Sequence, residues 1–584
     1  MNRNRDNATQ SSTDLPTFTV LVDGEDLGGL YGILGVVVTK AINKIPKARL
    51  VLADGDVALQ DFEISSSDVF VPGRKIELKA GYHNDEETIF EGIIIRHSIK
   101  SIENKNPVLQ IDMRDQAVKM TIGRKNRYFT NVKDSEIIEE LINAYGLESD
   151  VEATNAEHRE MVQYYTTDWD FMIARAEVNG KLVFVDDGNV TVKKPDLDQD
   201  PVLKAVYGRN VISFEAGMDA RDQFSLSRSM SWDYSSQELA EEEGDDPGIK
   251  EPGNIPAKEL AGVIGLDAWM QQHGGRVESD ELKAWSESKM LKCRLAKVKG
   301  RVRIPGFSEV KPGDIIHIQG FGERFNGPAF VSSIHHQKAT ETSWTTDIEF
   351  GMDQEWFINK YDDIVARQAS GLVPPIHGLQ VGVVTNIHED PEGEDRIKVR
   401  MPLIDPADEG VWARMISLDA GDNRGIVFRP EIGDEVIVGC INDDPRDPVI
   451  LGMVHSSGKP SPIEAEEDNN KKGIVTRSEL KMFFDDDKKS VTIETPNGNK
   501  WELSDDSGTV RIEDENGNKV SLASDGITLE SSGDLTLKAA GDIKIEGTNI
   551  TGSASAGFKA QGGSGAELSS SGQTVVKGSL VSIN

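Results

Sequence analysis

Apolar and polar residues alternate in short runs over the first part of the chain, which is the pattern of half-buried β-strands. Turn residues separate the runs FTVLVDG, ARLVLADG, KIELKAGY, TIFEGIIIRHSI and VLQIDMRD. This spacing predicts a small antiparallel barrel or sandwich over residues 16–125, after a polar, flexible N-terminus at residues 1–15. The most apolar stretch, residues 27–38, fits a buried strand, a subunit interface or a cargo contact. We favour a strand that also contributes to a subunit interface.

The apolar period changes to that of helices in residues 126–296, which predict a mixed region. DSEIIEELINAYG has an apolar stripe, a capping residue at Asp134 or Ser135, and a stop at Gly146. A second helix is predicted over DWDFMIARAEVNG with Asp168 as its cap, and a third over SDELKAWSESKMLKCRLAK. KLVFVDDGNVTVKK predicts a hairpin, whereas the acidic, Pro- and Gly-rich residues 237–258 predict an exposed loop.

Strand patterns return in residues 297–365, where VRIPG, IIHIQG, AFVSSIHHQ and TTDIEFG predict a second barrel-like β domain. Residues 366–460 contain six more strand-like runs, which are GVVTNIH, RIKVRMPL, VWARMISL, GIVFRP, DEVIVGCI and PVILGMV. Short strands in so small a module predict a closed barrel of the OB-fold type. Residues 461–472 are polar and predict a linker. The predicted fold is therefore mainly β with some α.

Pairs of apolar residues separated by one residue recur through residues 473–584, and the later pairs repeat every eight residues. The regular pairs, with Gly-Asp turns between them, are Ile527/Leu529, Leu535/Leu537 and Ile543/Ile545. Residues at i and i+2 of a strand point to one face, so each repeat offers one narrow apolar face. A single-chain β-solenoid could stack such faces, but two apolar residues per repeat better suit a narrow core shared between chains. We therefore expect these six residues to form the trimer core of an intertwined triple-stranded β-helix.

Composition narrows the classes of function. The net charge of −35 disfavours binding to nucleic acid or to an anionic membrane surface. Only two cysteines are present, which indicates neither a disulfide framework nor a Cys-based zinc site. Residues 27–38 are too few to span a membrane, and no export signal is visible. The chain is therefore expected to fold in a reducing cytoplasm.

No pattern points to catalysis, a cofactor or a metal. His335 and His336 are adjacent, so in a strand their side chains point to opposite faces and cannot share an ion. FFDDDKK could bind a cation, but a solvated turn explains it better. The sequence has no GxSxG and no Walker A motif, and paired carboxylates are inevitable among 99 acidic residues. The predicted OB-fold lacks the basic, aromatic-rich face that binds nucleic acid. We expect a protein that is not an enzyme and uses no cofactor.

The segment from Arg424 to Ser456 resembles the OB-domain signature of VgrG and contractile-phage tail spikes. An RPE-x-GDEV-x-VG run is followed in order by N-x-DP-x-x-P-V-x-LG. The matching positions include Arg429, Pro430, Gly433, Asp434, Asn442, Pro445, Pro448 and Gly452. This is a signature of fold and assembly and not of an active site.

The resemblance implies an architecture for the whole chain. The two β domains and the helices before residue 365 correspond to a hub, three copies of which form a pseudo-sixfold ring on a hexameric tube and its baseplate. The OB-fold forms a collar, and residues 473–584 form the triple-stranded β-helix of a spike. The segments INKIPKARLVLADGD and FVPGRKIELKAGYHNDEETIFEGIIIRHSIKS are most similar to spikes of extracellular contractile particles of the antifeeding-prophage type.

The resemblance also implies partners and a place of action. A PAAR-type tip protein would sit on the C-terminal end, effector cargo is possible, and contact with the target membrane is transient. Such particles need no signal peptide, and we expect release of a phage tail-like particle. Residues 457–472 are too few to hold the lysozyme domain of some phage spikes, and the sequence ends at Asn584 without the effector domain of some type VI spikes. The alternatives are a VgrG of a cell-bound type VI secretion system and a trimeric receptor-binding fibre.

Overall fold

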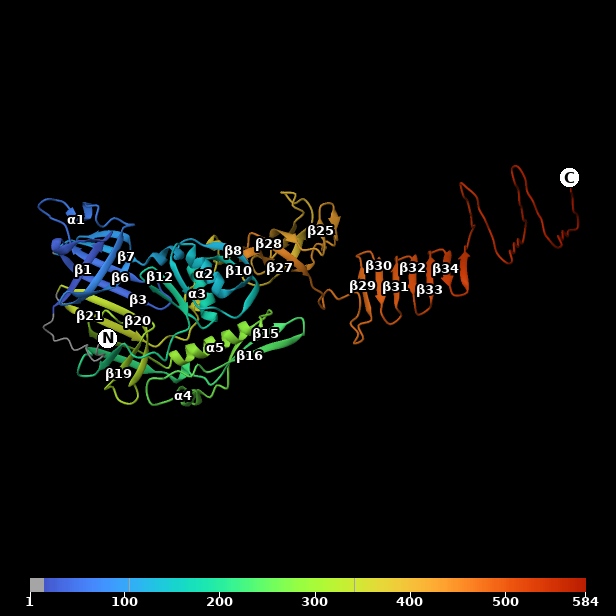
Figure 1. The fold of residues 1–584 in the computed structure, drawn as a ribbon. Helices are drawn as coiled ribbons and strands as arrows, with labels where there is room; N and C mark the ends of the chain where they lie inside the picture. The colour runs from blue at the N-terminus through green and yellow to red at the C-terminus, as the bar shows by residue number, and fades with distance from the viewer. Residues whose placement is uncertain (1–14, 104, 341, 584) are drawn as a thin grey trace. The chain divides into compact units, whose positions relative to one another are not determined.

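The computed structural model of the chain describes residues 15–103, 105–340 and 342–583. The chain divides into two compact units (Figure 1). The first unit comprises residues 1–378 and 440–448, and the second comprises residues 379–439 and 449–584. The flexible N-terminus predicted at residues 1–15 lies, except for Leu15, outside the described residues. Within the described ranges, no helix has both the length and the apolar character needed to cross a membrane.

One large sheet of the first unit contains the strands of both predicted β domains. Its order is β14-β18-β21-β20-β3-β4-β7-β6-β5-β1-β2, with β19 pairing both β20 and β13. The bounds are β1 (Pro16–Val22), β2 (Glu25–Asp26), β3 (Ile33–Ala41), β4 (Lys47–Ala53), β5 (Lys75–Tyr82), β6 (Asp85–Lys100), β7 (Val108–Arg114), β13 (Leu203–Val206), β14 (Ser213–Met218), β18 (Val298–Pro305), β19 (Ile315–Gln319), β20 (Gly327–Ala339) and β21 (Thr342–Phe350).

The two predicted domains keep separate cores but share backbone hydrogen bonds. One core contains Leu50 and Phe90, and the other contains Val302 and Ile348. They join where β3 pairs antiparallel with β20, and Figure 1 shows blue β3 near yellow-green β20. The ambiguous stretch at residues 27–38 thus supplies a central strand of the sheet. The sequence indicated the strand but not this junction, because alternation reports which face is buried and not which neighbour pairs.

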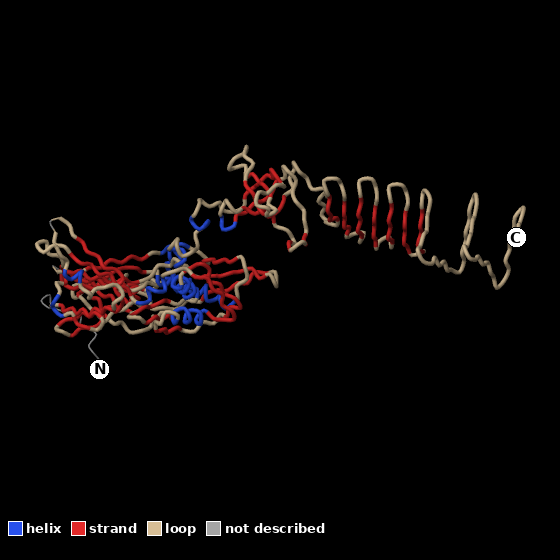
Figure 2. Tube along the Cα trace, turned by 90° about the horizontal axis from the view of Figure 1, so that it is seen from above, coloured by secondary structure: helices blue, strands red, loops and turns tan. Residues whose placement is uncertain are grey.

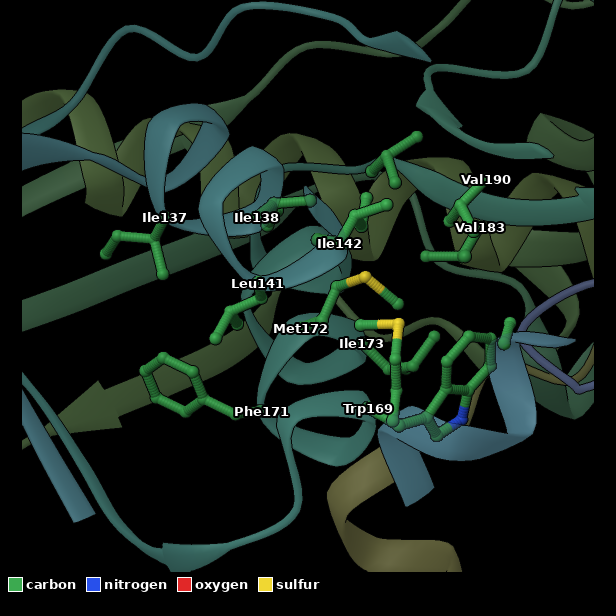
Figure 3. Packing of buried hydrophobic residues seen from close by; sticks show 14 of the residues in the cluster. Ile137, Ile138, Leu141, Ile142, Trp169, Phe171, Met172, Ile173, Val183 and Val190 are labelled. Atoms are coloured by element: carbon green, nitrogen blue, oxygen red, sulfur yellow. The ribbon is translucent and has the colours of Figure 1, made fainter. Parts of the chain in front are cut away.

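Two helices pack together in the mixed region. α2 (Asp134–Asn143) and α3 (Asp168–Val178) bury the predicted apolar stripe, which Figure 3 shows as Ile138, Leu141 and Ile142 beside Trp169 and Met172. The predicted caps are wrong. Thr167 caps α3 through its hydroxyl, which accepts from the Asp170 amide at 3.0 Å, and Lys133 occupies the cap position of α2. Asp134 and Asp168 are the first helical residues, and their buried carboxylates bind other side chains.

The remaining strands and helices of this unit form small layers. β8 (Lys125–Lys133) pairs with β10 (Glu157–Thr166), and the predicted hairpin is β11 (Leu182–Asp186) with β12 (Asn189–Lys193), joined by β9 (Glu148–Val151). β15 (Ser227–Asp233) lies between β16 (Glu238–Gly244) and β17 (Trp269–His273). The helices are α1 (Glu63–Ser66), α4 (Ala257–Ile264), α5 (Ser279–Leu295) and α6 (Phe357–Lys360).

The prediction of a loop over residues 237–258 is wrong for residues 238–244, which form a strand. Glu238–Gly244 is β16, which pairs with β15 and packs on α5. Its end fits closely, because a Cβ at Gly244 would lie 2.4 Å from the Ser286 carbonyl carbon. The run of glutamates concealed the strand pattern in the sequence. One face of β16 is exposed to solvent, where acidic side chains do not destabilise the strand.

The second unit begins with the predicted closed barrel. Five strands form it: β22 (Gln380–Asn386), β23 (Ile397–Arg400), β24 (Val411–Met415), β27 (Glu435–Cys440) and β28 (Pro448–Met453). Its core includes Val384, Val399 and Val436. The prediction of a sixth strand over GIVFRP is wrong. Arg424–Gly425 forms the short strand β26 against β25 (Ala420–Gly421), and residues 426–430 are exposed and irregular up to Pro430.

The repeat region has two parts with different backbone pairing. β29 (Lys471–Val475), β30 (Lys481–Asp485), β31 (Ser490–Glu494), β32 (Lys500–Ser504), β33 (Thr509–Glu513), β34 (Lys519–Ala523) and β35 (Gly526–Glu530) form one antiparallel meander. Figure 2 shows this row of red strands followed by loop-coloured turns. Residues 531–583 contain no helix or strand. The sequence indicated the repeat, but neither this division nor the start of β29 two residues inside the predicted linker.

Candidate assembly surface

The meander of β29–β35 places its apolar side chains in two columns on one face. Cross-strand partners stand directly opposite each other, so a column is read from the pairing of the strands. One column is Ile474, Met482, Ile493, Trp501, Ile512, Val520 and Leu529. The other is Phe484, Val491, Leu503, Val510, Leu522 and Ile527. We call these two columns the apolar face of the meander.

Within the part of the chain that the structure describes, no layer covers the apolar face. The last buried apolar residue of the described chain is Ile450, so nothing in the meander is buried. Ile527 is 71% exposed and Leu529 is 54% exposed. The middle residue of each strand points to the opposite face of the sheet, and these residues are mostly polar, such as Thr492, Glu502 and Arg511. An apolar face of this length is much larger than the scattered exposed residues of a monomeric protein.

The octads after Glu530 also lack partners. Leu535, Leu537, Ile543 and Ile545 are each more than half exposed. Through the described part of residues 531–583, no backbone amide or carbonyl bonds another backbone group. The predicted core residues therefore lie in two settings: Ile527 and Leu529 on a paired strand, and the other four on unpaired chain. These exposed amides and carbonyls can bond water or another chain.

The first half of the OB signature builds the turn into β27. Gly433 has φ +87°, which glycine adopts without strain. Asp434 then accepts from the Glu431 amide at 2.9 Å and from the Lys459 ammonium at 2.6 Å. Burial opposes ionisation of this carboxyl, but these hydrogen bonds outweigh it and hold the pKa of Asp434 below its usual range. Arg429, in the irregular segment just before this turn, donates to Asp395.

The second half of the signature builds the connection from β27 to β28. Asn442 has φ +52°, a left-handed conformation that asparagine tolerates well. The Asp444 carboxylate accepts from the backbone amide and the guanidinium of Arg446. Pro445 lies in this turn, while Pro448 and Gly452 lie in β28. The signature residues therefore shape two turns of one barrel and do not converge on a common reaction centre.

Sequence reasoning missed an apolar surface beside the signature. Ile416, Leu418, Val427 and Phe428 are each at least half exposed. They line a hollow of about 670 Å³ together with Arg429 and the β25–β26 turn. The apolar letters of GIVFRP were the available signal, but they were assigned to a buried strand.

A cluster of buried ionisable groups lies in the first unit. The Asp134 carboxylate accepts from the Arg175 guanidinium at 2.7 Å and from the Asn179 amide at 2.8 Å, and it lies 3.0 Å from His158 Nε2. Arg175 also donates to Glu281 at 2.6 Å. Burial opposes ionisation, but the hydrogen bonds from His158 and Arg175 outweigh it and hold the pKa of Asp134 well below its usual range. Every group is bonded to another, as in a structural network.

The two adjacent histidines point to opposite faces, as the sequence predicted. His336 is buried and its Nδ1 lies 2.9 Å from the Thr346 hydroxyl, while His335 Nδ1 lies 2.9 Å from the Thr39 hydroxyl. Burial lowers the pKa of His336 to about 3, so it is neutral at physiological pH. No group of three or more metal-ligating side chains occurs in the described ranges.

Two family models match the chain. The model of the Alg8 N-terminal domain matches residues 12–340, which is more than half of the sequence. The model of the type VI secretion system/phage-baseplate injector OB domain matches residues 380–455, the segment that forms the closed barrel.

Curated relatives include two type VI secretion system spike proteins of Pseudomonas aeruginosa. VgrG1b is 24% identical over 439 residues, which cover 70% of this chain and 57% of VgrG1b. VgrG1c is 27% identical over 191 residues, or 30% of this chain and 26% of VgrG1c. The chain therefore spans little more than half the length of the first relative and less of the second.

Solved structures with similar arrangements include tail and spike proteins. The 43 kDa tail protein of prophage MuSo2 from Shewanella oneidensis has a TM-score of 0.43 and 12% identity, covering 58% of this chain and 98% of that chain. A chain of the lidded Francisella PdpA–VgrG complex has a TM-score of 0.40 and 11% identity, covering 90% of this chain and 81% of that chain.

Proposed function

We propose that this chain is the trimeric central spike of a contractile injection apparatus. The chain belongs to the Alg8 N-terminal domain family and to the VgrG and contractile-phage tail spike family. In this role the first unit is the hub that caps and nucleates the tube. The OB barrel forms the collar, and the meander with its octads forms a rigid needle that punctures the target envelope when the sheath contracts.

The apolar face of the meander is the observation that carries the proposal. Two columns of apolar side chains would bury each other if three copies met around a common axis. The unpaired octads would gain backbone partners in the same assembly. Association with identical chains would therefore both bury the apolar face and pair the backbone of the octads. A rod closed in this way resists unfolding kinetically, because no chain can leave without unthreading.

The kind of particle is a finer part of the proposal. The similarity of residues 42–56 and 70–101 to antifeeding-prophage spikes supports an extracellular particle that leaves the producing cell without a signal peptide. A cell-bound type VI spike is the second candidate, because the curated relatives are named as such spikes. We further propose a hexameric tube and baseplate proteins as partners of the hub, a PAAR-type tip at the needle end, and no enzymatic activity of the chain.

The mass of the purified chain in solution tests the trimer. We expect multi-angle light scattering to give three times the mass of the 64.0 kDa chain, with no dissociation on dilution. A monomer would contradict the shared core. Specific binding of a glycan by residues 473–584 would instead favour the receptor-binding fibre.

A further inference from the structure

A cluster of cations lies on the solvent face of the large sheet of the first unit. Lys47 and Arg49 of β4, Arg96 of β6 and Arg114 of β7 point to the same side, opposite to the buried Leu50 and Met113. Lys47 pairs with Arg114 across one strand boundary, so the two cations lie on neighbouring strands. We call these four residues the basic face.

Among the described residues, the basic face is neutralised only in part. Asp112, the carboxylate between Arg49 and Arg96, accepts from Arg49 at 2.6 Å. Lys47, Arg96 and Arg114 have no ion pair with any described residue. Four cations thus face one carboxylate, in a protein whose net charge is −35. Keeping like charges together costs free energy, and surface lysines and arginines usually pair or disperse.

A pocket gives the basic face a defined shape. It has a volume of about 260 Å³ and is lined by Lys47, Arg49, Arg114, His335 and Val37, among others. It lies at the β3–β20 junction, where the Thr39 hydroxyl holds the His335 ring in place. Beyond His335, the buried Asp347 is matched by two arginines, Arg301 at 2.9 Å and Arg303 at 2.8 Å. Glu349, opposite Arg301, limits the excess of positive charge at that end.

We propose that the basic face is a docking site for an acidic protein segment, which inserts an aspartate or glutamate carboxylate between Lys47 and Arg114. Guanidinium groups bind carboxylates through paired, charge-assisted hydrogen bonds. The Val37 side chain offers an apolar wall for the aliphatic stem of a glutamate. This partner is distinct from the copies that would cover the meander, and the proposal does not depend on the oligomeric state.

Nucleic acid fits this surface less well than protein. A polyanion needs a continuous track of cations, whereas the basic face is confined to a few neighbouring strands. The overall charge of −35 repels a long polyanion beyond the reach of one patch. A folded acidic protein can present a few carboxylates locally and keep the rest of its charge away.

Binding of a fluorescein-labelled oligoglutamate peptide to the full chain tests the proposal by fluorescence anisotropy. We expect the double variant Lys47→Glu, Arg114→Glu to weaken binding at least about tenfold at physiological ionic strength. The matched control is Lys258→Glu, Arg367→Glu, which makes the same change in charge at two exposed residues elsewhere in the first unit. The control should bind like the unmodified chain.

Three results would overturn the proposal. Equal loss in both double variants would mean that only net charge matters. Stronger displacement of the peptide by inorganic polyphosphate than by oligoaspartate would assign the face to phosphate. A change of mass in the Lys47→Glu, Arg114→Glu variant would assign it to contact between copies. The neutral variant Lys47→Gln, Arg114→Gln repeats the comparison with less disturbance of folding, and circular dichroism checks each protein.

Discussion

At the scale of single residues, the buried carboxylates of the helix starts have a larger role than capping. Asp134 joins α2 to α3 and α5 through Arg175 and Glu281. Asp168 likewise accepts from Lys125 at 2.7 Å, from Tyr145 at 2.8 Å and from Gln163 at 2.8 Å. Removing one partner from such a cluster leaves the others buried and unpaired, which costs more than the bond itself.

The variant Asp134→Asn should destabilise the first unit by about 3–5 kcal/mol at pH 7, because it removes the buried carboxylate that pairs with Arg175 and leaves Glu281 as the one remaining ion-pair partner of that guanidinium among the described residues. The folded pKa of Asp134 is depressed, so its stabilisation is present above the unfolded pKa of about 3.9 and is lost as the pH falls toward the folded pKa. Urea unfolding at neutral and acid pH measures both effects.

The control for this experiment is Asp219→Asn, which removes an exposed partner of Arg221. It should leave the urea midpoint nearly unchanged, because exposed pairs are screened by water. If Asp134→Asn unfolded at the same urea concentration as the unmodified chain across the pH range, the network would contribute nothing to stability.

At the scale of elements, assembly of the proposed spike depends on which side of each strand is apolar. The variant Leu535→Asp, Leu537→Asp places two charges in the proposed shared core and should abolish a trimer that survives detergent. The control Thr528→Asp, Thr536→Asp adds the same charge at the intervening positions, which point away from the core. Unboiled gel electrophoresis in detergent measures both, and a surviving core variant would mean that the repeat faces are misassigned.

The elements themselves were largely predictable, and their partners were not. The alternation in β1, β4 and β7 and the stripe of α2 follow from burial, which a sequence reports directly. β16 was missed because its exposed side is acidic. The segment GIVFRP was misassigned because an apolar run is the same whether it is buried in its own chain or exposed for another. The basic face was invisible, since Lys47, Arg96 and Arg114 meet only through the strand order.

At the scale of the whole molecule, we expect no hydrolytic activity. The ionisable groups around Asp134 are all engaged with one another, and the residues of the OB signature shape turns. Purified chain incubated with peptidoglycan should release no soluble muropeptides detectable by chromatography, with lysozyme as the positive control. Release that persists in the Leu535→Asp, Leu537→Asp variant would point to a catalytic site in the hub or collar and would contradict a purely structural spike.

The division of the repeat region into a meander and octads has a consequence for alignment. Eight-residue phrases with the same apolar spacing can still match their apolar pairs when one chain slips by a whole phrase, and each slip loses a single layer at the end. Octads alone would therefore trap many misaligned assemblies. The strands of the meander carry different side chains, with Met482 and Phe484 on β30 and Trp501 on β32. In the proposed trimer the meander fixes the relative register of the three chains, and the octads continue in that register.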